Sequence, residues 1–192
     1  CNTVLPIYIF DDNIKLGGAS KWWLHHSLNS LKKSLKELNS DLYFFKGIPK
    51  KILNQLADKH DIKNIYWNRL YDPYSVNRDS EIKTNLINKN INVQSFNASL
   101  INEPWEIKNK SNSFFKVFTP YWKRCLEEGV EIKLQKPPEK IKTLFIKSLQ
   151  STSDKDLKLF PKKSNWAKKS LSHWKPGEKN ALINFNNFKN GI

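Results

Sequence analysis

The 192-residue chain has no methionine and only two cysteines, Cys1 and Cys125. Without a C-x-x-C pair, neither a disulfide framework nor a thiolate zinc site is indicated, and a reducing compartment fits. The four histidines show no metal-ligand spacing, so we expect no metal site. The absence of an initiator, with Cys1 running straight into an apolar stretch, predicts that a segment precedes this chain.

Long apolar runs and glycine motifs are also scarce. No run approaches the roughly 20 residues that cross a bilayer, and no signal peptide is visible, so we expect no membrane partner. Neither common phosphate-binding glycine motif is present, nor is a G-x-S-x-G elbow. Gly17-Gly18 is more simply a loop than a nucleotide cradle. We therefore expect no self-contained active site.

Acidic residues are few: 18 Asp and Glu against 33 Lys and Arg, a net charge of +15. Such an excess favours a polyanionic partner, nucleic acid first, because Lys and Arg release the counterions condensed on phosphates. A compositional bias toward Lys, Asn and Ile is the alternative explanation.

Short apolar segments alternate with helical patterns in the first hundred residues. Ser20 is the predicted cap of a helix that ends near Asn39, and Pro49 and Asp72-Pro73 start two more helices. This alternation indicates right-handed βαβ units and a parallel sheet. The four predicted strands are Val4–Phe10, Leu42–Gly47, Asn64–Asn68 and Val93–Phe96.

The run FKVFTPYWKRCL, Phe115 to Leu126, predicts a short helix that starts at Thr119-Pro120. Its apolar stripe is wide enough to dock on a core. The stripe consists of Tyr121, Trp122, Cys125 and Leu126.

The composition changes after Gly129. Lys133 to Lys163 has Pro137-Pro138, many lysines and few apolar residues, so it reads as an extended, protease-sensitive connector. A helix after Pro176 carries an apolar face that has no partner in the remaining residues. We therefore divide the chain into residues 1–129, 130–164 and 165–192.

Five segments in the same order resemble the DNA photolyase/cryptochrome family, and its class I-like deoxyribodipyrimidine photolyases in particular. The FKVFTPYW run is similar to the closing segment of the family's first domain, and WKPGEKNAL, from Trp174 to Leu182, to the opening of its helical domain. The other three are GGASKWWLHHSL (17–28), YWNRLYDPYSVNRD (66–79) and FNASLINEPWEI (96–107).

The resemblance implies an α/β fold, a Rossmann-like doubly wound parallel sheet with strand order 3-2-1-4-5. Its first strand is missing here, so the four visible strands should fall into two pairs. Residues 1–129 would be an N-terminally truncated antenna-binding domain and 130–164 a linker. Residues 165–192 would begin an all-α FAD-binding domain, truncated at its C-terminal side.

The function implied is light-dependent repair of cyclobutane pyrimidine dimers by a flavoprotein lyase. FAD would be bound by the helical domain, with no catalytic residue in this fragment, damaged DNA as the partner, and a monomer in the bacterial cytosol with the nucleoid. A cryptochrome-type blue-light photoreceptor is the alternative within the family. A non-catalytic nucleotide- or nucleic-acid-binding α/β module is the alternative from another class.

The resemblance also implies an antenna chromophore pocket. Lys21 is otherwise a solvated lysine, although a cation there suits a flavin phosphate, and Asn97 is otherwise a turn residue that bonds its own backbone. Ser113 stands where folate-binding members carry an acid, which favours a deazaflavin or FMN over folate. The residues implied are Phe10, Asp11, Asp12, Lys21, Asn97 and Asn112.

Four tryptophans lie in or near these motifs and could be mistaken for electron carriers. Aromatic residues beside apolar periodicity are usually core residues, and we favour that interpretation. They are Trp22, Trp23, Trp67 and Trp105.

Overall fold

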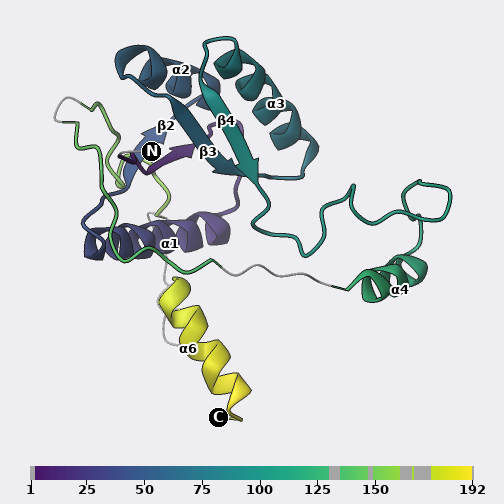
Figure 1. Ribbon diagram of the computed structural model, residues 1–192. Helices are drawn as coiled ribbons and strands as arrows, with labels where there is room; N and C mark the ends of the chain where they lie inside the picture. The colour runs from purple at the N-terminus through teal and green to yellow at the C-terminus, as the bar shows by residue number, and fades with distance from the viewer. Residues whose placement is uncertain (1–2, 130–134, 147–148, 161–165, 167–173, 192) are drawn as a thin grey trace. The chain divides into compact units, whose positions relative to one another are not determined.

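The computed structural model describes residues 3–129, 135–146, 149–160, 166 and 174–191 (Figure 1). The chain forms two compact units, Cys1–His60 with Pro138–Ile192, and Asp61–Pro137. We call these the first and the second unit and describe each by itself.

The first unit contains a parallel pair of strands, β1 (Ile7–Phe10) and β2 (Tyr43–Lys46). Helix α1 (Gly18–Glu37) connects them, and α2 (Pro49–Lys59) follows β2. β1 begins three residues later than the apolar run predicts. Pro6 precedes it, and a proline has no N–H with which to extend the ladder.

Helix α1 corrects one sequence-based prediction. Its N-cap is Gly17 rather than Ser20, and no side chain caps it. Glycine costs only a few tenths of a kcal/mol relative to Ser at this position, so the helix can start earlier. The other end agrees with the prediction, because Leu38 is the C-cap and Asn39 adopts a left-handed φ of 59°.

The core of the first unit includes residues from the predicted connector. Leu157 and Leu159 are each 2% exposed, and Thr143 and Thr152 form bridges with Val4 and Phe44. Burying a leucine side chain contributes about 1.5–3 kcal/mol, so the premise that few apolar residues anchor this segment is wrong for residues 138–146 and 149–160. The domain boundaries at 129 and 164 stay a prediction. The buried cluster is Phe10, Leu28, Leu42, Phe44, Leu157 and Leu159.

The second unit contains the other parallel pair, β3 (Asn64–Asn68) and β4 (Asn92–Phe96). They are connected by α3 (Pro73–Ile87), which lies alongside β4 in Figure 1. Asp72 caps this helix as predicted, since its Oδ1 accepts the Ser75 N–H at 3.0 Å. The predicted division of the four strands into two pairs is thus confirmed.

Helix α4 (Phe118–Glu128) has Val117 as its N-cap, so it begins two residues earlier than the predicted start at Thr119-Pro120. Its apolar stripe is only partly buried, since Cys125 is enclosed while Trp122 and Leu126 are exposed. Docking of the whole stripe is therefore not observed within the described residues.

Helix α6 (Glu178–Lys189) belongs to the first unit, and Lys179 forms an ion pair with Glu37 of α1 at 2.6 Å. Leu182, Phe185 and Phe188 are exposed, which agrees with the predicted apolar face without a partner. Across the described ranges, no helix has the length and apolar content of a membrane span.

Candidate functional site

The end of β1 in the first unit carries three of the predicted pocket residues. Phe10 belongs to the core, and Asp11 is buried with only 3% exposure. The Asp11 Oδ1 accepts the Asn13 N–H at 3.0 Å, which shapes the turn that leaves the strand. Asp12 is exposed and lies 3.9 Å from the Lys46 ammonium at the end of β2. Two carboxylates therefore lie at the carboxyl end of β1 and a lysine at the carboxyl end of β2, at the edge where open parallel sheets bind ligands.

Lys21 is half-buried in the first turn of α1. Its backbone N–H donates to Gly17 at 3.0 Å, and the N-terminal helix dipole adds to the positive charge of its side chain. This end of the helix suits an anionic group.

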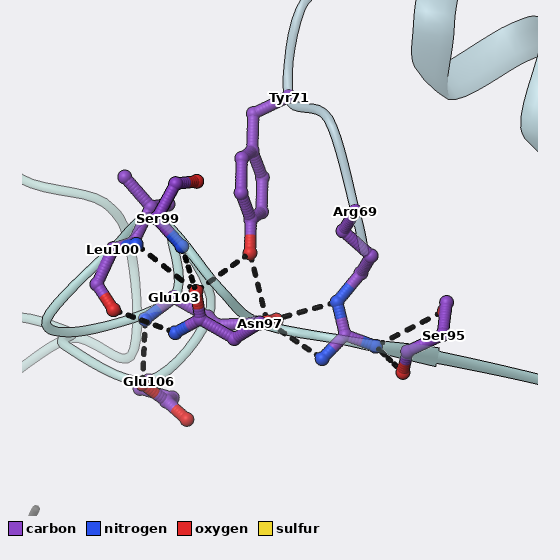
Figure 2. Close-up of polar contacts among 8 residues, drawn as sticks. All are labelled: Arg69, Tyr71, Ser95, Asn97, Ser99, Leu100, Glu103 and Glu106. Atoms are coloured by element: carbon purple, nitrogen blue, oxygen red, sulfur yellow. Dashed lines mark hydrogen bonds and ion pairs between the residues drawn. The ribbon is translucent and has the colours of Figure 1, made fainter. Parts of the chain in front are cut away.

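A second polar cluster occupies the carboxyl ends of β3 and β4 in the second unit, and Arg69 is its centre (Figure 2). The Arg69 Nη1 donates to the Ser95 carbonyl at 2.6 Å and to the Ser95 hydroxyl at 3.2 Å. The Arg69 backbone N–H donates to the Phe96 carbonyl at 2.8 Å. The end of β4 thus orients the guanidinium.

The opposite edge of the guanidinium, Nε and Nη2, binds Glu103. The Arg69 Nε and Nη2 lie 2.8 and 2.6 Å from the Glu103 Oε1, and the Tyr71 hydroxyl donates to the same oxygen at 2.9 Å. Glu103 is only 3% exposed. The hydrogen bond to Glu103 raises the pKa of Arg69, and burial followed by the bond to Glu103 raises the pKa of Tyr71. Both groups therefore act as donors at neutral pH.

The side-chain amide of Asn97 makes most of its hydrogen bonds to the backbone of its own loop. Its Oδ1 accepts the Ser99 and Leu100 N–H groups at 3.2 and 3.0 Å, and one Nδ2 hydrogen donates to the Leu100 carbonyl at 2.7 Å. The turn interpretation of Asn97 is thus confirmed. Its predicted role in the pocket stays a prediction.

Asn112 is exposed and adopts a left-handed φ of 56°, a conformation that asparagine tolerates well. Its N–H donates to the Asn109 carbonyl at 2.9 Å, so it closes the turn of residues 109–113. Asn109 organises this turn, since its side chain accepts the N–H groups of Ser111 and Ser113.

The structure brings the six predicted residues together only in part. Phe10, Asp11 and Asp12 are consecutive at one strand end, and Lys21 lies in the same unit, whereas Asn97 and Asn112 lie in the second unit. The tryptophan interpretation holds for Trp22, which is buried, and Trp67 is half-buried. Trp23 and Trp105 are exposed, so they are not core residues.

Sequence reasoning missed the roles of Arg69, Tyr71 and Glu103. The motifs WNRLY and NEPW contain all three residues, and Arg69 comes directly after the predicted strand Asn64–Asn68. An arginine and a glutamate close to predicted strand ends were the available signal, because ligand-binding and loop-fixing groups gather there.

Two parallel βα units with polar residues at their strand ends define a Rossmann-like α/β protein. The family model for DNA photolyase matches residues 1–142. The chain is 36% identical over 191 residues to the deoxyribodipyrimidine photo-lyase of Agrobacterium fabrum, covering 98% of the chain and 39% of that protein. The chain therefore belongs to the DNA photolyase/cryptochrome family.

Two further similarities bear on the branch of the family. Cryptochrome-2 of Arabidopsis thaliana is 33% identical over 195 residues, covering 97% of the chain and 32% of the relative. A bacterial class III photolyase from Agrobacterium tumefaciens is 34% identical in sequence with a TM-score of 0.88, over 97% of this chain and 39% of that one. Since that enzyme is described as class III, assignment of this chain to a class I-like group stays a prediction.

The Synechocystis cryptochrome has the same fold, with a TM-score of 0.81 at 19% identity, over 94% of this chain and 39% of that chain. The chain spans well under half the length of the curated relatives and solved structures that it matches.

Proposed function

We propose that the protein repairs cyclobutane pyrimidine dimers in DNA under light, and that this chain supplies its antenna-binding part. The observation that carries the proposal is the 36% identity to a deoxyribodipyrimidine photo-lyase over 98% of the chain. The net charge of +15 supports association with DNA, in the bacterial cytosol with the nucleoid.

FAD supplies the light-driven electron transfer in this proposal, and we assign no described residue of the chain to it. An enzyme that acts on a base must first take it out of the stack, which costs a few kcal/mol and less for a damaged base. The role of this chain is to bind and orient a second, light-harvesting chromophore.

The charges of the described residues fit a deazaflavin or FMN antenna. Lys21 and the N-terminus of α1 would hold a phosphate or acidic tail. Asp11 and Asp12 would repel that tail and accept hydrogen bonds from the hydroxyl groups of a ribityl chain instead. Asn97 and Asn112, which belong to the second unit, are the other two residues that the family resemblance implies for an antenna.

The test uses the product of the complete reading frame that encodes this chain. We expect FAD binding and reversal of dimers under blue or near-ultraviolet light, with no reversal in the dark. Lys21→Gln or Asn97→Ala should lower repair per incident photon at antenna wavelengths while direct flavin excitation still drives repair. Lys33→Gln, an exposed lysine on the same helix, is the matched control.

Loss of repair at every wavelength in a folded Lys21→Gln protein would contradict the antenna role. A cryptochrome-type photoreceptor is the second candidate, supported by the 33% identity to Cryptochrome-2 over 97% of the chain. Binding of FAD without repair of dimers at any wavelength would favour that candidate.

A further inference from the structure

A cavity of about 380 Å³ lies in the first unit, between helix α2 and the chain segment that begins at Leu149. We propose that this cavity binds a small aromatic carboxylate, whose ring lies on an apolar floor and whose charge meets a basic rim. None of the six residues implied for the antenna lines the cavity. The proposal therefore goes beyond the light-driven role and does not rest on it.

The floor of the cavity is apolar. Phe45 of β2 and Leu56 of α2 are buried, with 7% and 8% exposure, and Ile52 lies one turn before Leu56 on the same face of the helix. Leu149, which is half-buried, supplies an apolar wall from outside the helix. A planar aromatic ring suits this floor, because it buries apolar area while little conformational freedom is lost on binding.

Both sides of the cavity are anchored to β2, so the cavity exists before a ligand binds. Helix α2 follows β2 directly after a short turn. On the other side, the Thr152 N–H donates to the Phe44 carbonyl at 2.7 Å, which fixes the segment at the edge of the strand. The volume lies at the lower end of the range for ligand pockets, which suits a small ligand.

The rim of the cavity is polar and carries positive charge. Gln55, Lys59 and His60 come from the second half of α2 and its C-cap, and Gln150 comes from the facing segment. Within the described part of the chain, these four side chains form no hydrogen bond or ion pair with one another or with other residues. No acidic side chain lines the cavity. The donor groups of the rim are therefore available to an anionic ligand.

The position of the basic groups favours a carboxylate over a phosphate. Lys59 is the last residue of α2 and His60 is its C-cap, so the partial negative charge of the helix C-terminus lies beside them. That charge opposes a doubly charged phosphate more than a singly charged carboxylate. A carboxylate can accept charge-assisted hydrogen bonds from the Lys59 ammonium and further bonds from the rim amides.

Calorimetric titration of the product of the complete reading frame with naphthoate tests the site, with naphthamide as the neutral analogue of the same shape. We expect saturable binding of naphthoate and about fivefold weaker binding of naphthamide, the usual effect of a partly exposed ion pair. Leu149→Ala should weaken the binding of both compounds alike, because this wall contacts the ring that they share.

Neutralising the rim tests the charge. The double variant Lys59→Gln/His60→Gln should raise the naphthoate Kd about fivefold and leave the naphthamide Kd unchanged. The matched control is Lys51→Gln, because Lys51 is an exposed lysine of the same helix that does not line the cavity. This control should change neither Kd.

Three results would overturn the proposal. The first is an absence of saturable naphthoate binding, and the second is an equal affinity of the rim variant and the unaltered protein for naphthoate. The third is loss of naphthoate binding in Lys21→Gln, because the compound would then lie at the residues implied for the antenna. Dimer repair is not measured in these titrations, so each of these results leaves the light-driven role in place.

Discussion

At the scale of single residues, His26 shows how packing constrains a titrating group. Its ring meets Trp22 at 4.8 Å and Phe160 at 6.0 Å between centroids. Its Nε2 is buried and has no hydrogen-bond partner among the residues that the structure describes. Burial, and to a lesser degree the neighbouring His25, lowers the pKa of His26.

The lowered pKa sets the sign of a pH dependence. Because the unfolded chain takes up the proton first, the stability contribution of neutral His26 is full above the unfolded pKa of about 6.5. It is lost as the pH falls through that value toward the lower folded pKa. We expect the free energy of unfolding to decrease between about pH 7 and 5, and His26→Phe, which keeps a ring, to flatten the decrease. Denaturant titrations at each pH measure this, and an equal slope in the variant would contradict it.

At the scale of elements, residues 138–146 and 149–160 pack within the first unit. Leu157 and Leu159 pack with Phe10, Leu28 and Phe44, and the Ile141 N–H donates to the Leu38 carbonyl at 3.0 Å. The segment therefore covers residues of both strands and of α1. Leu157 and Leu159 lie in turns and irregular structure rather than in a helix or strand. Their spacing therefore follows neither the helical nor the strand repeat.

Leu157→Ala tests this packing. We expect a loss of about 2–5 kcal/mol in the free energy of unfolding, the usual cost of a cavity at a fully buried leucine. Phe145→Ala, in the same segment but 64% exposed, should cost less than about 0.5 kcal/mol. Equilibrium denaturation of both variants gives the comparison, and equal effects would mean that the segment does not stabilise the unit.

At the scale of the whole molecule, the described sheets have two strands each. Two-stranded sheets are marginal in water, and a strand with one neighbour is a template for further pairing. We expect the isolated 192-residue chain to be marginally stable and to self-associate as its concentration rises. Sedimentation and thermal unfolding measure this, and a cooperative melt of a monomer would argue against it.

The sequence by itself determined most of the local structure and the family. β3, α2 and α3 lie where the pattern predicts them, because β-rich runs, first-turn prolines and the Asp72 cap act within a few residues. The ordered motifs likewise needed no fold to indicate the family.

Only the tertiary structure decided which distant residues meet. Arg69 and Glu103 are 34 positions apart, and Ser40 and Thr143, whose hydroxyls lie 2.6 Å apart, are separated by 103. Such contacts depend on the path of the chain between them, which no local propensity encodes. The burial of Glu103 and of Leu157 follows from that path, because a side chain becomes buried only when remote segments cover it.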